Sequence, residues 1–164
     1  VVLDLDHFKT LNDTHGHDVG DDVIVAFADI MRRTAPRGAL LARTGGEEFV
    51  VMLPASSIED ISALAERISL AAAAESGERH PAFTVRGGAS CAIPGETFAD
   101  VMRRADSACY EAKRMGRNCI VALPPGDDAC PIPLSIDLAT RDASAMATLF
   151  DRRPRGPRYT AELN

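Results

Sequence analysis

The chain has 164 residues, of which 46% are hydrophobic and 26% are charged, as expected for one globular domain rather than a disordered or fibrous chain. Its formal charge of −6 argues against non-specific nucleic-acid binding, which depends on Lys and Arg neutralising phosphates. No apolar run reaches the roughly 20 residues of a membrane span, and no secretory signal is visible, so we expect a cytoplasmic domain, whether or not a parent protein is tethered to a membrane.

The first 123 residues alternate between short apolar strands and amphipathic helices. Ser57 with Asp60, and Thr97 with Asp100, are capping-box pairs that begin two of the helices. We expect strands at 1–5, 39–42, 49–53, 83–92 and 119–123, and helices at 20–34, from 58 onward and from 98 to the glycine at 116. Without its last helix and strand, this order is the ferredoxin-like α+β plan, an antiparallel sheet with helices on one face.

The composition changes at residue 123. The segment 124–164 holds six of the ten prolines and begins with a Pro-Pro-Gly loop signal. We therefore assign residues 1–123 to the domain and expect 124–164 to be a partly disordered, Pro-rich extension. One short helix is expected within it, from the helical spacing of Ala139, Ala143, Met146 and Phe150.

The first cluster of chemically useful residues follows the opening strand. Alternation places Asp4 and Asp6 on the same face of that strand, and a polar stretch rich in Asp, Asn, Gly and His follows them. Hard carboxylate oxygens suit Mg²⁺, which binds one or two carboxylates together with substrate phosphates. A solvated strand end is the alternative interpretation of the same residues.

The second cluster is the turn Gly45-Gly46-Glu47-Glu48. Glycines let the backbone approach a ligand without a Cβ clash, and the two acids supply a metal ligand or a general base. A plain polar hairpin turn explains the same four residues.

The third cluster holds Lys113 and Arg117, spaced so that both face one way from the end of a helix. Such a pair suits a polyphosphate, although cations also favour helix C-termini because of the helix dipole. Together, the three clusters describe a nucleoside triphosphate site, because metal-bound carboxylates are a known solution for nucleotidyl transfer.

These clusters, in this order, resemble the GGDEF domain family, the diguanylate cyclases, over residues 1 to about 123. The family pattern D-x-D-x-F-K-x-x-N-D is matched from Asp4 to Asp13, and Gly16-His17 and Gly20-Asp21 follow in register. The signature is Gly-Gly-Glu-Glu-Phe at 45–49, and the third motif runs from Ala105 to Asn118 with Cys109 in place of the usual Leu. The resemblance implies an α+β palm-type fold and condensation of two GTP into cyclic di-GMP with release of pyrophosphate, at the interface of a homodimer.

The resemblance also implies roles for individual residues. Asp4, the Leu5 carbonyl and Glu47 would bind Mg²⁺, or Mn²⁺ in its place, with Glu48 assisting. Glu47 would also accept the proton of the attacking 3′-hydroxyl. The residues expected to contact GTP are Asn12 and Asp21 at the guanine edge, His17 beside them, Lys9, Lys113 and Arg117 at the phosphates, Phe8 below the triphosphate, and Gly45 and Gly46 in the turn.

The sequence departs from the family pattern in three places. Residues 36–39 read Pro-Arg-Gly-Ala where many members have R-x-x-D, so we expect no allosteric inhibitory site there. The strand T-V-S-I-G-V becomes Thr-Val-Arg-Gly-Gly-Ala at 84–89, and Gly87 in place of a large apolar residue is expected to weaken that strand. The family's first helix is missing before Val1, so we expect an N-terminally truncated domain and a sensory or dimerising module upstream in the parent protein.

Two alternatives to a diguanylate cyclase follow from the same residues. One is a degenerate domain that binds GTP as a regulatory module without turnover, against which the complete signature, Lys9, Lys113 and Arg117 argue. The other is a palm-type cyclase that acts on one nucleotide. The guanine-reading pair Asn12 and Asp21 disfavours ATP, because guanine offers donors to a carboxylate and an acceptor to an amide.

Overall fold

The chain forms one mixed sheet, described here from a computed structural model that covers residues 1–54, 56–75, 77, 80–126 and 131–134. Its strands are β1 (Val2–Leu5), β2 (Leu40–Arg43), β3 (Glu48–Met52), β4 (Val85–Ala89), β5 (Ile120–Ala122) and β6 (Ile132–Leu134). They are arranged in the order β2-β3-β1-β4-β5-β6. All neighbouring pairs are antiparallel except β4 and β5, which are parallel.

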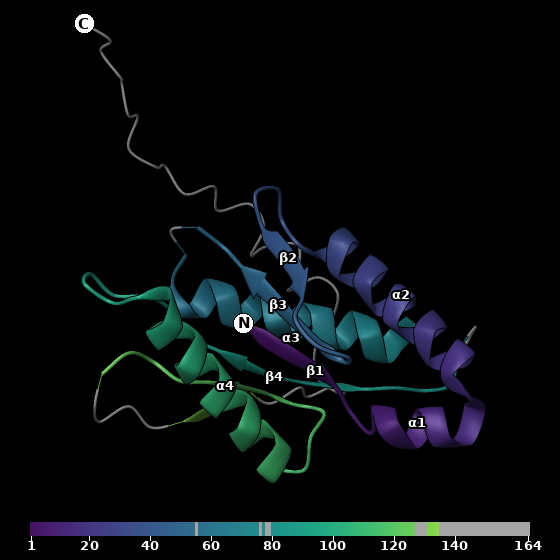
Figure 1. The fold of residues 1–164 in the computed structure, drawn as a ribbon. Coiled ribbons are helices and arrows are strands. Elements are labelled where there is room, and N and C mark those ends of the chain that lie inside the picture. Colours follow the sequence, from purple (N-terminus) through teal and green to yellow (C-terminus); the bar gives the residue numbers. More distant parts are fainter. Residues whose placement is uncertain (55, 76, 78–79, 127–130, 135–164) are drawn as a thin grey trace, which may run out of the picture.

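Four helices cover the two faces of this sheet in the described part of the chain (Figure 1). They are α1 (Phe8–His15), α2 (His17–Thr34), α3 (Ile58–Glu75) and α4 (Phe98–Arg114). Side chains alternate along a strand, so Leu3 of β1 packs with α2 and α3, whereas Val2 packs with α4 on the opposite face. Without α4 and the strands that follow it, helices pack on one face only, as the ferredoxin-like plan predicts.

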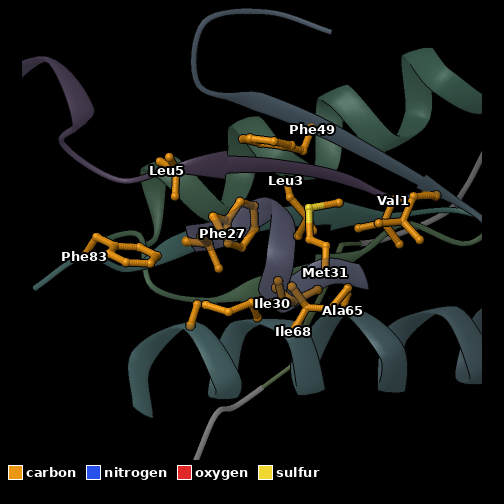
Figure 2. Close-up of a cluster of buried hydrophobic side chains, with 14 of the residues drawn as sticks. Val1, Leu3, Leu5, Phe27, Ile30, Met31, Phe49, Ala65, Ile68 and Phe83 are labelled. Carbon is orange, nitrogen blue, oxygen red and sulfur yellow. The ribbon is translucent and has the colours of Figure 1, made fainter. Parts of the chain in front are cut away.

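The main core lies between the sheet and helices α2 and α3 (Figure 2). Phe27 is completely buried at its centre, and its ring meets that of Phe49 edge-on, with centroids 5.0 Å apart. Aromatic pairs prefer this geometry because the positive ring edge faces the negative ring face. The core therefore fixes β1 and β3 side by side, and the candidate site lies at the end of these strands.

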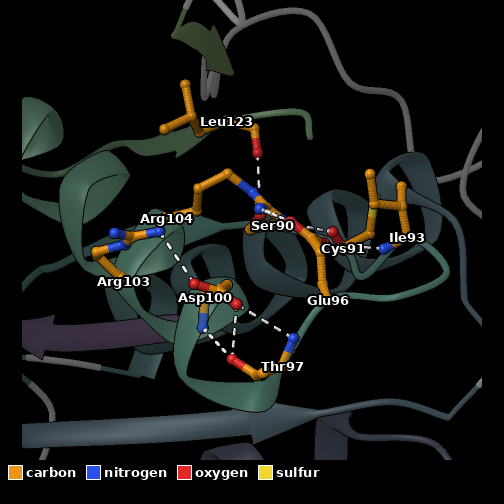
Figure 3. Close-up of polar contacts among 9 residues, drawn as sticks. All are labelled: Ser90, Cys91, Ile93, Glu96, Thr97, Asp100, Arg103, Arg104 and Leu123. Carbon is orange, nitrogen blue, oxygen red and sulfur yellow. Dashed lines mark hydrogen bonds and ion pairs between the residues drawn. The ribbon is translucent and has the colours of Figure 1, made fainter. Parts of the chain in front are cut away.

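A polar cluster fastens the start of α4 to the end of β4 (Figure 3). The Arg104 guanidinium donates to Ser90 Oγ at 2.9 Å and to the Cys91 carbonyl at 2.7 Å, and it pairs with the Glu96 carboxylate. Ser90 Oγ in turn donates to the Leu123 carbonyl at 3.1 Å. We call these residues the Arg104 cluster; they join β4, α4 and the segment after β5.

Most predicted elements are confirmed, with small shifts at their ends. Both capping boxes are present, since Asp60 N donates to Ser57 Oγ and Asp100 N donates to Thr97 Oγ. The sequence did not predict α1 or β6. The strand β6 lies beyond residue 123 and pairs with β5, so the sheet continues into the Pro-rich segment.

Two further observations concern the ends of the described chain. The helix expected around residues 139–150 lies outside the described residues. Among the helices that the structure describes, none has the length and apolar character needed to cross a bilayer.

Candidate functional site

The end of β1 and the glycine turn lie side by side. Leu5 N donates to the Glu47 carbonyl at 3.2 Å, and Asp4 is the direct cross-strand neighbour of Glu48. Phe49 and Val50, which follow the turn, are buried in β3 and anchor it to the sheet. The four residues expected to surround the metal therefore come from two neighbouring strand ends.

The turn itself is held by its own residues. The Arg43 guanidinium donates to the Gly45 carbonyl at 3.1 Å and to the Gly46 carbonyl at 2.8 Å. A Cβ at Gly45 would lie 3.0 Å from Glu48 Oε2, whereas a Cβ at Gly46 would have open space around it. Gly45 thus provides the close approach inside the turn, and Gly46 leaves its outer side free for a ligand.

Close to the glycine turn, one arginine joins Asp4 of β1 to Asp6, which directly follows that strand. Arg86 of β4 is the cross-strand neighbour of Asp4. Its guanidinium lies 2.5 Å from Asp4 Oδ2 and 3.0 Å from Asp6 Oδ1. Asp6 Oδ2 also accepts from Thr84 Oγ1 at 2.8 Å and from Asn118 N at 2.9 Å. We call these five residues the Arg86 cluster.

The two aspartates of this cluster are satisfied to different degrees. Both Asp6 oxygens accept hydrogen bonds, whereas Asp4 Oδ1 is buried and has no hydrogen-bond partner among the described residues. The pKa of Asp4 is raised from 3.8 to about 6, chiefly by burial; Glu47 and Glu48 also raise it, and Arg86 opposes them. A buried acceptor without a partner is costly, so Asp4 Oδ1 is the atom in this region that is best suited to receive a cation.

These residues fit a divalent cation as a partial site. Within the described part of the chain, no three His, Cys, Asp or Glu side chains gather to form a metal site. Mg²⁺ needs no such group, because it takes one or two carboxylates and completes its shell with water and substrate phosphates. The unpartnered Asp4 Oδ1, with Glu47 and the Leu5 carbonyl close by, meets that smaller requirement.

A second unpartnered polar atom lies between α1 and α2. Asn12 Oδ1 is buried and lacks a hydrogen-bond partner among the described residues. A Cβ at Gly20 would lie 1.8 Å from that atom and 3.3 Å from Phe8 Cζ, so a larger residue at this position would displace the Asn12 amide. Asp21 follows at once and is exposed on α2, as is His17 at the start of that helix. The predicted guanine-reading residues therefore lie on two adjoining helices.

The predicted phosphate-binding cations are less well gathered. Lys9 is exposed and paired with Asp13 at 2.9 Å. Lys113 is exposed near the end of α4, but the helix ends at Arg114. Arg117 lies in the following turn with a left-handed φ of 67°, so it is not on α4 with Lys113, and the helical spacing that suggested a common direction for the two side chains does not apply. The Gly116 turn redirects the chain before Arg117 is reached.

Sequence reasoning missed the Arg86 cluster as a unit. One feature could have indicated it: Arg86 is a charged residue inside a strand whose five residues are all buried, so it needs a buried partner. Thr84 and Asn118 carried no signal of their own, since they meet Asp6 across 78 and 112 residues of chain. Gly87 stays a predicted weak point of β4; a Cβ there would lie 2.6 Å from Leu3 Cδ2 and 2.8 Å from Ile120 Cδ1, so neighbouring side chains occupy the space that a larger residue would fill.

Comparisons with known proteins agree with this fold. The family model described as "Diguanylate cyclase, GGDEF domain" matches residues 1–119. The chain is 38% identical over 122 residues to diguanylate cyclase DgcM of Escherichia coli, covering 74% of this chain and 30% of DgcM. It is 43% identical over 121 residues to diguanylate cyclase DgcP of Pseudomonas aeruginosa, covering 71% of this chain and 18% of DgcP. The chain thus spans less than a third of these curated relatives.

Solved structures give the same result. The GGDEF domain of DgcB from Caulobacter crescentus, in complex with c-di-GMP, is similar with a TM-score of 0.70 and 39% identity, over 74% of each chain. The active GGEEF domain of a diguanylate cyclase from Vibrio cholerae is similar with a TM-score of 0.69 and 34% identity, over 74% of this chain and 79% of that one. The chain therefore belongs to the GGDEF domain family of diguanylate cyclases.

Proposed function

We propose that this chain is the catalytic domain of a diguanylate cyclase, which condenses two GTP into cyclic di-GMP and releases two pyrophosphates. The observation that carries the proposal is the joining of the glycine turn to the end of β1, where Leu5 N donates to the Glu47 carbonyl beside the unpartnered Asp4 Oδ1. Family membership and the names of the curated relatives support it.

In this proposal each part of the site has a separate task. Asn12 and Asp21 bind the guanine edge, with Phe8 and His17 beside them. Lys9, Lys113 and Arg117 hold the phosphates, and the open side of Gly46 lets the turn approach the substrate. The chain contributes mainly positioning and charge neutralisation, which supply most of the rate enhancement in reactions of this kind.

Proton transfer is assigned to Glu47. Its carboxylate accepts the proton of the attacking 3′-hydroxyl, as a general base within hydrogen-bond reach would. Asp4, Glu47 and the Leu5 carbonyl would hold Mg²⁺ or Mn²⁺, with Glu48 assisting. When bound, the cation neutralises phosphate charge and lowers the pKa of the attacking group.

The product requires two GTP molecules, and we assign one to each domain. We therefore propose that the active form is a homodimer in which each 3′-hydroxyl attacks the α-phosphate held by the partner. The rate per chain should rise with protein concentration and then level off when nearly all chains are dimeric.

The test is Glu47→Gln, with Glu59→Gln as the matched control on the exposed start of α3. With GTP and Mg²⁺, wild type and Glu59→Gln should form cyclic di-GMP, detected by mass spectrometry. Glu47→Gln should form none while retaining most GTP binding. Full turnover by Glu47→Gln would contradict the assigned role.

A second candidate is a GTP-binding regulatory module without turnover. One observation favours it, namely that Asp4, the expected metal ligand, is already paired with Arg86. GTP binding by the wild-type chain without any cyclic di-GMP at high protein concentration would support this candidate over the cyclase.

A further inference from the structure

Arg86 lies where a charged side chain is least expected. It stands in the middle of β4, between β1 and β5, and only 8% of its surface is exposed. On the same face of the sheet, α4 packs so closely that a Cβ at Gly88 would lie 2.0 Å from the Ala105 carbonyl oxygen. The guanidinium is therefore enclosed, and its direction is set by the two carboxylates that it contacts.

The carboxylate contacts of Arg86 are of two kinds. Asp6 is a structural partner, because Thr84 and the Asn118 backbone also bind it and both of its oxygens are satisfied. Asp4 is bound through Oδ2 only, and its other oxygen has no partner among the described residues. The cluster carries two aspartate charges against one guanidinium, with Glu47 and Glu48 close enough to Asp4 to act on it electrostatically.

A guanidinium and a divalent cation compete for such a carboxylate. Arginine stays charged at all physiological pH values, so it cannot give way by losing a proton. Two positive groups on one carboxylate repel each other, and the repulsion is strong where water is excluded. Metal binding at Asp4 therefore requires either a shared carboxylate at a cost or the withdrawal of Arg86 toward Asp6.

We propose that Arg86 is an internal counter-ion that occupies Asp4 in the absence of metal and sets the concentration of divalent cation that the site requires. The inference rests on the proposed function, since it concerns the metal of that site. In this arrangement the guanidinium stays paired with Asp6 throughout, whereas Asp4 pairs with Arg86 without metal and with the cation when metal binds. The chain should consequently need more Mg²⁺ than a chain with a small neutral residue at position 86.

The experiment measures Mn²⁺ binding to the purified chain by electron paramagnetic resonance, with no nucleotide present. Arg86→Gln keeps a hydrogen-bond donor but removes the charge, and should tighten Mn²⁺ binding by about tenfold or more. Arg86→Lys keeps the charge and should stay near wild type. Arg104→Gln, the same change in the Arg104 cluster, should leave Mn²⁺ affinity unaltered. Adding Asp4→Asn to Arg86→Gln should abolish the gain.

A second measurement uses the wild-type chain, so that the inference does not depend on a variant that fails to fold. In ¹⁵N spectra of arginine side chains, Mg²⁺ should shift the Nε resonance of Arg86 and leave that of Arg104 in place. The inference would be overturned if wild type and Arg86→Gln bound Mn²⁺ with equal affinity, or if Mg²⁺ did not change the Nε resonance of Arg86.

The outcome is separable from that of the proposed activity. Tighter Mn²⁺ binding by Arg86→Gln without any cyclic di-GMP from the wild type would support the counter-ion and contradict the cyclase. Cyclic di-GMP synthesis by the wild type, together with equal Mn²⁺ affinities of wild type and Arg86→Gln, would support the cyclase and contradict the counter-ion.

Discussion

Two arginines, Arg104 in α4 and Arg86 in the strand β4 against which α4 packs, make similar contacts but differ in how fully their partners are satisfied. Arg104 binds one carboxylate, one hydroxyl and one backbone carbonyl, and its charge is matched by that of Glu96. Arg86 binds two carboxylates, and one of their oxygens has no partner in the described part of the chain. The Arg104 cluster, in which the charges are matched, stabilises the fold. The Arg86 cluster retains negative charge and an acceptor without a partner, and a ligand site needs both.

The pKa shifts of the two clusters have opposite signs. The hydrogen bond from Arg104 lowers the pKa of Glu96 below its ordinary value of 4.5, whereas burial raises the pKa of Asp4 to about 6. The folded state therefore favours the charged form of Glu96 and the neutral form of Asp4. The charged form is favoured at Glu96 by the hydrogen bond from Arg104 and disfavoured at Asp4 by burial.

The largest effect is expected from Gly88→Ala, which should disturb both clusters together. A Cβ at this position would lie 2.0 Å from the Ala105 carbonyl oxygen and 2.3 Å from Cys109 N, so α4 would have to move. We expect the free energy of unfolding to fall by about 3 kcal/mol, measured by urea denaturation. Gly46→Ala, where a Cβ has open space, is the control; equal stability of both variants would contradict the close packing of α4.

The next largest loss of stability is expected from Asp6→Asn, which tests whether Asp6 anchors the Arg86 cluster. Asp6→Asn replaces the charged carboxylate that accepts hydrogen bonds from Thr84, Arg86 and the Asn118 backbone. Hydrogen bonds to charged groups are stronger than neutral ones, so we expect a loss of about 2 kcal/mol in the free energy of unfolding. Asp106→Asn, on the exposed face of α4, should cost far less. Loss of equal size in both would show that Asp6 does not anchor the cluster.

A smaller effect should follow from Arg104→Met, and it should depend on pH. Glu96, whose folded pKa is lowered, contributes stability that is present above its ordinary pKa and is lost as the pH falls through the folded value. The variant should therefore be less stable than wild type near neutral pH, and the difference should shrink in acid, below the ordinary Glu pKa of 4.5. Thermal melts across that range check it, and a difference that grows in acid would refute the assignment.

The last effect is expected at Asp4, where the dependence of stability on pH has the opposite sign. Its folded pKa of about 6 exceeds the ordinary value of 3.8, so its contribution to stability is present below about pH 4 and is lost as the pH rises through about 6. Asp4→Asn should remove this decline from the metal-free chain, as seen in urea midpoints between those pH values. A decline unchanged in the variant would assign it to another group.

Local signals predicted much of this fold, and long-range pairing explains what they missed. The capping boxes at Ser57 and Thr97 predicted helix starts because their hydrogen bonds span three residues. Helix α1 was missed because it has no such signal: it begins after His7, which has a left-handed φ of 55° and no capping side chain. The turn at 45–48 and the strand at 1–5 were each predicted, and family resemblance joined them.

The Arg86 cluster required the fold itself. Arg86 reaches Asp6 across 80 residues of chain, and no local pattern carries information over such a separation. A charged residue in a buried strand indicated that a partner existed, but only the register of β1 against β4 identifies the partner as Asp4.

The short strand β6 has a consequence for how this domain meets other chains. It occupies the open side of β5, and its central residue is Pro133. Proline has no N–H to offer a further strand, and short, proline-bearing edges resist the edge-to-edge pairing that leads to aggregation. Among the described residues, this edge of the sheet is therefore a poor template for a further strand.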